Sequence, residues 1–340
     1  MILIVLAPTW VFSQDIHFSH IHASPTLLNP AMTGLFNGDL RFIANVKSQW
    51  QSVTNAYSTF AGSLDGHIYE MGNRDVIGGG LQFYRDKAGD LNFQTTSTSL
   101  GLSLLKSLDG KGKHYVSIGV QNAFISSQLD FTKIIAFDNE PAIVEGANNN
   151  INYWDVSAGI GWFYTFNKNS SAYLGAALLH INEPLVTFFE KDNVISEGTS
   201  LYRKLVLHGG ADIKLNRNST LKPNFIFNDQ GPHQEINVGT FWKYSKLGKG
   251  MGNRSNTAIY FGAWVRWYKV QQNAGSDAII AAVRFDHKNT YITFSFDINI
   301  SSLSQVSYGK GGPELSLIQI IDFNKGGRKS SKVECPEFYY

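Results

Sequence analysis

Three histidines stand close together near the start of the chain, in the stretch "HFSHIH". Histidine is the commonest metal ligand in proteins, so His17, His20 and His22 raise the question of a metal site. A zinc site needs further ligands in a rigid geometry, and nothing nearby in the sequence supplies a second pair. We therefore expect no metal and no cofactor, and interpret these histidines as mobile or packed inside the fold.

Two further histidines, His180 and His208, could act as general bases if a serine or a carboxylate lay beside them. No local motif joins them to such a partner, and a catalytic arrangement of this kind is recognised by its geometry. We therefore expect no enzymatic activity and interpret both histidines as members of polar networks. The single cysteine, Cys335, cannot form an intrachain disulfide.

A third group of residues falls on the polar faces of extended segments. Its charged members are Arg41, Lys47, Arg266, Arg284, Asp286 and Asp297. Such residues could line a diffusion pore, or they could fill a plugged interior with ion pairs. Glycines on the same faces would let a plug or a neighbouring side chain approach closely. They include Gly159, Gly161, Gly239 and Gly262, and the nearby aromatics Tyr260, Trp264 and Tyr268 favour a crowded interior.

The elements that must position these residues are β-strands. In "TYITFSFDINIS", residues 290–301, apolar residues recur at every second position from Ile292 to Ile300, with polar residues between them. Side chains on a strand alternate between its two faces, so this segment is one strand with an apolar and a polar face. A soluble core, another chain or lipid could cover the apolar face.

About fourteen such segments follow one another with hardly a helix candidate between them. Most reach the ~9–11 residues that a tilted transmembrane strand needs. Only 16% of the 340 residues are charged, and the net charge of +2 gives no reason to expect nucleic acid. We predict an all-β fold, a transmembrane antiparallel β-barrel in the outer membrane of a Gram-negative bacterium. The alternative is a secreted soluble β-protein.

The connections between the predicted strands give an independent test of this fold. If both chain ends lie in the periplasm, odd-numbered connections face outward and even-numbered ones face the periplasm. The long connections 128–151 and 183–200 are the fifth and seventh, whereas 167–170 and 287–289 are short and even-numbered. The tenth, 246–256, is longer than the rule allows. The pattern mostly fits the short periplasmic turns and longer extracellular loops of bacterial barrels.

The chain is predicted to have four parts. Residues 1–14, "MILIVLAPTWVFSQ", fit a secretory signal peptide that lacks the usual positive charges, with a short buried strand as the alternative. Residues 15–38 lie in the periplasm or fold into the lumen as a plug, and residues 39–323 form the barrel. Residues 324–340 form a periplasmic tail with four basic residues and an aromatic end. This composition suits docking to a partner, unless the tail is disordered.

Short motifs at the two ends of the chain occur in a fixed order. The matching residues are Phe18 and Ser19; Asn29, Pro30, Ala31 and Gly34; Arg41, Gln49 and Trp50; Ser63 and Asp65; Glu314, Ser316 and Leu317; and Cys335, Pro336 and Phe338. In this order they resemble the PorP/SprF family of type IX secretion system membrane proteins from Bacteroidota. His20 and Glu337 depart from the family, which has glutamine and arginine there, so a charge-based docking role is not carried over to the tail position.

The resemblance implies a non-enzymatic outer-membrane component of the type IX secretion and gliding machinery, acting as a docking or anchoring subunit. Its implied partners are type IX secretion components on the periplasmic side and/or a large secreted adhesin, besides outer-membrane lipid. The residues expected to dock a partner are Phe18, Asn29, Pro30, Ala31, Gly34, Cys335, Pro336 and Phe338. Because "NPA" also occurs near the hatch of fatty-acid-type barrels, a porin or FadL-like hydrophobic-solute transporter is the alternative.

Overall fold

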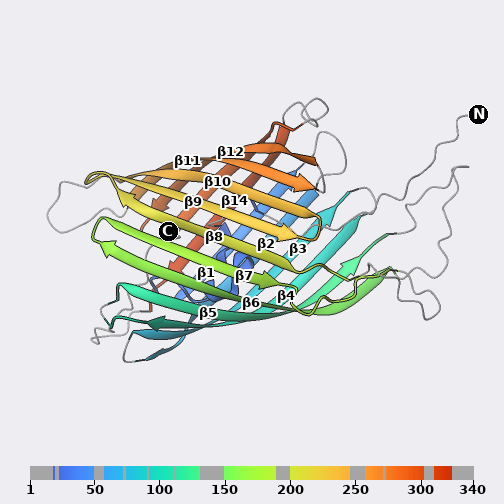
Figure 1. Ribbon diagram of the computed structural model, residues 1–340, viewed down its shortest axis with the longest axis horizontal. Coiled ribbons are helices and arrows are strands. Elements are labelled where there is room, and N and C mark those ends of the chain that lie inside the picture. Colours follow the sequence, from blue (N-terminus) through green and yellow to red (C-terminus); the bar gives the residue numbers. More distant parts are fainter. Residues whose placement is uncertain are drawn as a thin grey trace, which may run out of the picture.

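A closed antiparallel β-barrel is formed by the described residues of the computed structural model (Figure 1). The described residues are 18–19, 23–49, 57–71, 74–89, 92–110, 112–130, 149–188, 200–245, 257–270, 273–301 and 310–323. The predicted signal peptide, residues 1–14, and the predicted tail, residues 324–340, lie outside these ranges. Within them, no helix is long and apolar enough to cross a membrane.

Fourteen strands are present in this described part of the chain. They are β1 (Leu40–Gln49), β2 (Tyr57–Met71), β3 (Asp75–Ala88), β4 (Phe93–Ser107), β5 (His114–Gln128), β6 (Asn150–Asn167), β7 (Ser170–Leu179), β8 (Lys204–Lys214), β9 (Ser219–Gln230), β10 (His233–Ser245), β11 (Thr257–Val270), β12 (Asn273–His287), β13 (Thr290–Asn299) and β14 (Lys310–Ile321). Each strand pairs with its sequence neighbours, and β1 pairs with β14 to close the ring. The predicted fold class and strand number are confirmed.

β13 has the apolar face and the polar face that its alternating sequence predicted. Phe294 is 51% exposed on the outside of the barrel, whereas Asp297 is 2% exposed inside it. Most other strands also expose large apolar side chains on the outside, whereas their buried side chains include many polar residues together with the apolar residues that pack inside the barrel. A water-soluble protein buries its apolar side chains, whereas a membrane barrel presents them to lipid. The apolar faces of these strands therefore contact lipid.

The two rims of the barrel can be told apart by their connections. β1, β5 and β7 run in the same direction, because neighbouring strands alternate. They therefore end at one rim, which also carries the long connections 128–151 and 183–200. This rim is here termed the outer rim, since bacterial barrels place their long loops outside the cell. The opposite rim, where β1 begins, is the inner rim.

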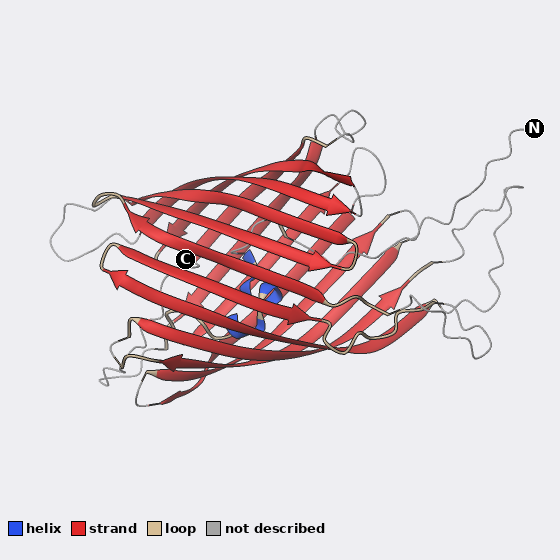
Figure 2. Cartoon of the chain, viewed as in Figure 1, coloured by secondary structure: helices blue, strands red, loops and turns tan. Residues whose placement is uncertain are grey.

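The segment that precedes β1 lies inside the barrel. It comprises residues 18–19 and 23–38 and is here termed the plug. Its helical parts, α1 (Pro25–Leu28) and η2 (Pro30–Met32), lie within the ring of strands in Figure 2. Of the two positions that the sequence left open for this segment, periplasm or lumen, these residues occupy the lumen.

Prolines and one asparagine determine the shape of the plug. α1 has proline at its first position, where no amide hydrogen is needed. It ends before Asn29, which precedes Pro30 and is therefore held extended, at φ −155° and ψ 118°. The Asn29 side chain accepts a hydrogen bond from the backbone amide of Ala31 and caps η2. The asparagine side chain is thereby held in a fixed position, from which it reaches the wall.

Apolar packing holds the plug against the inner half of the lumen. Met32, Leu35 and Phe36 form one cluster with wall side chains that include Ile43 of β1 and Val76 of β3. The three plug residues are at most 6% exposed. Burying side chains of this size contributes about 1.5–3 kcal/mol each, so the cluster alone favours a seated plug.

Candidate functional site

An ion pair between β1 and β2 binds the plug near the inner rim. This inner anchor comprises Arg41, Asp65, Met32 and Gly34. The Arg41 guanidinium donates to both carboxylate oxygens of Asp65, at 2.8 and 2.5 Å. Asp65 also accepts from the Gly34 amide at 2.7 Å, and Arg41 also donates to the Met32 carbonyl at 3.2 Å. Both charged side chains are fully buried, so a bidentate pair inside the protein holds the plug to the wall.

Asn29 connects the middle of the plug to β6 and β8. Its amide nitrogen lies 3.0 Å from the Ile160 carbonyl oxygen and 3.0 Å from His208 Nε2. Because the amide nitrogen only donates, His208 Nε2 must accept, which makes the imidazole neutral with its proton on Nδ1. The amide oxygen accepts from Ala31 at 2.9 Å. Asn29 is fully buried, so both ends of its side chain are used inside the protein.

Replacing Asn29 with aspartate should loosen the plug. Asn29→Asp keeps the oxygen that accepts from Ala31 but turns the donor into a second acceptor facing the Ile160 carbonyl. We expect the free energy of unfolding to fall by about 1–3 kcal/mol or more, because a buried group loses its partners. Urea unfolding of the lipid-reconstituted protein measures the loss.

Asn182 offers a matched control for this substitution. Its side chain also accepts from a backbone amide (Val156, 3.0 Å) and donates to a backbone carbonyl (Trp154, 2.7 Å), but it is exposed to water. Asn182→Asp should therefore change stability by a few tenths of a kcal/mol, since surface substitutions usually stay within roughly ±0.5 kcal/mol. Equal losses in the two variants would contradict the role of Asn29.

Glycines in the wall let the plug backbone lie directly on the strands. A Cβ atom on Gly119 of β5 would overlap the Pro30 carbonyl and lie 2.5 Å from the Ala31 nitrogen. One on Gly159 of β6 would overlap the Asn29 amide oxygen, and this is the close approach that the sequence predicted there. The other three predicted glycines accommodate wall side chains; they are Gly161, Gly239 and Gly262.

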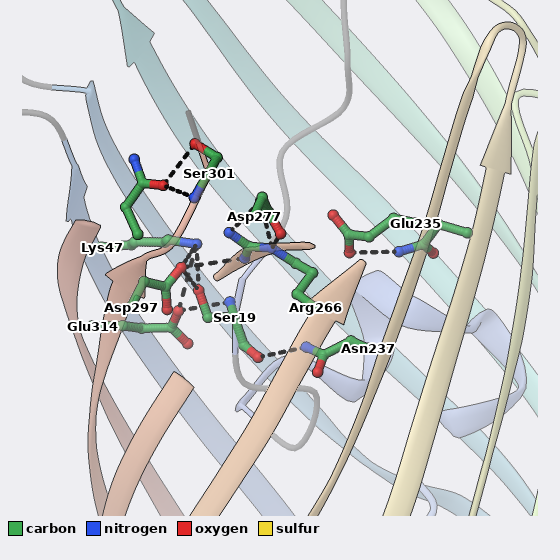
Figure 3. Close-up of polar contacts among 11 residues, drawn as sticks. Ser19, Lys47, Glu235, Asn237, Arg266, Asp277, Asp297, Ser301 and Glu314 are labelled. Atoms are coloured by element: carbon green, nitrogen blue, oxygen red, sulfur yellow. Dashed lines mark hydrogen bonds and ion pairs between the residues drawn. The ribbon is translucent and has the colours of Figure 1, made fainter. Parts of the chain in front are cut away.

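A second polar group surrounds Ser19 near the outer rim (Figure 3). This outer cluster comprises Ser19, Lys47, Asn237, Arg266, Asp277, Asp297 and Glu314. The Ser19 hydroxyl donates to Asp297 at 2.6 Å and accepts from the Lys47 ammonium at 2.6 Å. Its amide donates to Glu314 at 2.8 Å, and its carbonyl accepts from Asn237 at 3.3 Å. Every polar group of Ser19 is thus bound by a wall side chain.

Ion pairs connect the wall side chains of the outer cluster to one another. Arg266 lies 2.9 Å from Asp277 and 3.2 Å from Asp297. The Lys47 ammonium lies 3.7 Å from Asp297 and 4.0 Å from Glu314. Charged groups so far from water are tolerated only when they are paired and hydrogen-bonded. The cluster therefore depends on the arrangement of all its members, Ser19 included.

The plug runs through the lumen from the outer cluster to the inner anchor. Arg41 and Lys47 belong to these two sites and lie on the same strand, about 20 Å apart at roughly 3.3 Å per residue. Between them, Asn45 of β1 donates to the Ala23 carbonyl at 2.7 Å. The chain therefore descends from the outer half of the lumen to the inner rim, where β1 begins.

Wall side chains also contact one another inside the barrel, away from the plug. Arg284 pairs with Asp286 at 2.6 Å, and its guanidinium lies over the rings of Tyr260 and Tyr291, at 4.7 and 4.9 Å. The charged residues expected in the lumen are all buried there: Arg41, Arg266, Arg284, Asp286 and Asp297. Each of them forms an ion pair with another side chain of the wall.

The residues expected to dock a partner fall into three groups. Asn29, Pro30, Ala31 and Gly34 are buried in the plug against the wall, so their surfaces are not open to a partner. In this structure Asn29 and Gly34 bind the wall through hydrogen bonds, and docking of a partner through these four positions stays a prediction. Phe18 is partly exposed beside Ser19. The tail positions Cys335, Pro336 and Phe338 lie outside the described residues.

The two histidines that the sequence singled out as candidate bases each have a buried polar partner. His180 Nδ1 lies 2.9 Å from the Asp155 carboxylate, and His208 binds Asn29. His17, His20 and His22 lie outside the described residues. Among the residues that are described, no group of three or more histidine, cysteine, aspartate or glutamate side chains could hold a metal ion.

Sequence reasoning missed several residues of the site, among them Asn45 and Asn237. Both stand at inward positions of alternating strands, and this was the available signal. The pattern shows that such a residue faces the lumen, but it does not show which plug atom the side chain meets.

Comparison with known proteins adds to this geometry. A family model described as "Type IX secretion system membrane protein PorP/SprF" matches residues 11–318. Curated proteins give no match. Among solved structures, the chain is similar to the Pseudomonas putida toluene transporter TodX, with a TM-score of 0.50 and 8% identity over 91% of this chain and 98% of that one. It is also similar to the Ralstonia pickettii toluene transporter TbuX, with a TM-score of 0.49 and 11% identity over 87% and 92% of the two chains.

Proposed function

Because this outer-membrane barrel belongs to the PorP/SprF family of type IX secretion system membrane proteins, we propose that it acts as a docking or anchoring subunit. Its partners are periplasmic components of the secretion machinery, a large secreted adhesin, or both. The observation that carries the proposal is the plug, which is bound to the wall at the inner anchor and at the outer cluster. With the lumen occupied and the outer wall in lipid, the rims and the chain ends are left for recognition.

A hydrophobic-solute transporter with an N-terminal hatch is the alternative function. Pockets for such ligands are lined mainly by apolar side chains. The outer cluster instead presents Lys47, Asp297 and Glu314 to the lumen. The likeness to TodX, at 8% identity, concerns the fold alone. These features favour docking over transport.

Removal of the tail tests the docking proposal. Deletion of residues 324–340 should abolish co-purification of periplasmic partners, because this basic and aromatic segment includes the docking positions that we propose, Cys335, Pro336 and Phe338. Partner recovery from detergent extracts, quantified by mass spectrometry, measures the effect. The barrel itself should still assemble, because β14 is retained.

The control for this deletion is a variant whose tail has the same length but consists of glycine and serine. It separates recognition by sequence from a need for chain length, and we expect it to behave like the deletion. Heat-modifiable mobility on gels verifies that both variants form barrels. Undiminished partner recovery together with normal adhesin export would exclude the tail from the mechanism.

A further inference from the structure

The outer cluster binds one residue of the plug in the way that a protein binds a peptide. Wall side chains from β1, β10, β13 and β14 converge on Ser19 and bind both its main-chain groups and its hydroxyl. No feature of this binding requires that Ser19 belong to the same chain as the wall. Any extended segment that presents an amide, a carbonyl and a small hydroxyl side chain at this position would make the same hydrogen bonds.

The cluster also needs an occupant. Lys47, Asp297 and Glu314 are each at most 2% exposed, and Ser19 supplies hydrogen bonds to all three. Removing Ser19 without a replacement would leave buried charged groups with fewer hydrogen-bond partners, which is unfavourable because each group loses part of what replaced its hydration. Water or another segment must therefore take its place.

We propose that the outer cluster is a peptide-binding site, occupied in the resting state by the chain's own Ser19. In the active state, an extended segment of a secreted partner, carrying serine or threonine, replaces Ser19. Glu314 then accepts from the segment's amide, Asn237 donates to its carbonyl, and the hydroxyl lies between Lys47 and Asp297. The identity of the partner rests on the proposed docking function, but the existence of the site does not.

The position of the cluster favours entry from outside the cell. Lys47 stands two residues before the end of β1, and Asp297 two residues before the end of β13, and both strands end at the outer rim. A segment that entered from the periplasm would have to pass the inner anchor and the apolar packing of Met32, Leu35 and Phe36. A polypeptide that enters from outside the cell meets the outer cluster before it meets the inner anchor.

Because Ser19 is covalently linked to the barrel, it competes strongly with any free peptide for the outer cluster. An experiment must weaken this competition. A tethered ligand has an effective concentration in the millimolar range, so a free peptide at about 10 μM is outcompeted roughly 100-fold at equal affinity. A substitution that weakens the binding of Ser19 to the outer cluster should therefore let a free peptide bind there. Ser19→Leu does this, because a leucine side chain does not fit between Lys47 and Asp297 and cannot bind either of them.

The probe is a fluorescein-labelled peptide with the sequence of residues 15–24, "DIHFSHIHAS", added to the full mature chain in detergent. Fluorescence anisotropy measures its binding to the wild type and to Ser19→Leu. We expect the variant to bind at least about tenfold more tightly than the wild type. A peptide with leucine in place of its first serine should bind to neither protein.

A substitution in the wall identifies the binding site. In the Ser19→Leu background, Asn237→Leu removes the donor to the peptide carbonyl and should weaken binding by about two- to tenfold, since a hydrogen bond contributes roughly 0.5–1.5 kcal/mol. If Ser19→Leu does not fold, Ser19→Gly removes the hydroxyl without adding bulk and should show a smaller gain in the same direction.

Equal peptide binding by the wild type and the folded variant would overturn the proposal, and so would binding that is indifferent to Asn237. Neither result bears on the docking function, which is read from partner recovery after removal of the tail. Conversely, loss of the docking function would leave peptide binding at the outer cluster intact.

Discussion

Replacing Arg41 with methionine should lower the free energy of unfolding of the barrel by about 3–5 kcal/mol. The substitution keeps the unbranched stem of the side chain but removes the charged guanidinium from a pair whose members are both fully buried. Asp65 would then keep the hydrogen bond from the Gly34 amide as a carboxylate without its cation. Urea unfolding in lipid vesicles, followed by tryptophan fluorescence, measures the change.

The ion pair of Arg203 with Glu183 is the matched control for Arg41. Its Nε lies 3.2 Å from the carboxylate, but both side chains are about half exposed, at 54% and 47%. Exposed pairs contribute about 0–1 kcal/mol, so Arg203→Met should have a small effect. The double variant Arg41→Met/Asp65→Leu should recover part of the loss, because it leaves no unpaired charge. A loss at Arg41 no larger than that at Arg203 would mean that the inner anchor does not hold the fold.

Replacing Gly119 with alanine should make the barrel conduct ions, whereas the wild-type barrel should not. The added Cβ atom would meet the backbone of Pro30 and Ala31, which cannot rotate away as a side chain can. The plug must therefore move off β5, at a cost of about 1–3 kcal/mol for overpacking. Single-channel recording in planar bilayers should show no steady steps for the wild type and steady steps for Gly119→Ala.

Gly62 of β2 provides the control for this experiment. A Cβ atom there would have its nearest neighbour, the Ile43 carbonyl oxygen, at 3.6 Å, which is an ordinary contact. The Gly62→Ala variant should therefore conduct no more than the wild type and should be equally stable. A large steady conductance of the wild type would favour the transporter alternative, and a silent, fully stable Gly119→Ala would show that the plug does not rest on β5.

Much of the fold could be predicted from the sequence, because each strand carries its own pattern. In β13 the alternation of Phe294 and Asp297 indicates which side faces out, and it does so without knowledge of any other strand. The same pattern places Arg284 and Arg266 inside. It does not distinguish a pore from a filled lumen, because an inward arginine is polar in both cases.

The site could not be predicted to the same extent, because its contacts join residues far apart in the sequence. Ser19 and Glu314 are separated by 295 positions, and no local periodicity connects them. The "NPA" stretch around Asn29 has the composition of a turn, but a turn signal describes the backbone and not what the side chain meets. Burial of Asn29 against His208 depends on where β8 lies, which only the closed barrel determines.

The outer cluster also has a consequence for how the barrel is assembled. Lys47 lies on the first strand, whereas Asp297 and Glu314 lie on the last two, so a partly inserted sheet holds the cation without its two carboxylates. Ser19 finds its full set of partners only when β14 has been placed beside β1. A nascent chain that stalls before this step therefore lacks the hydrogen bonds that hold its amino-terminal segment in the lumen.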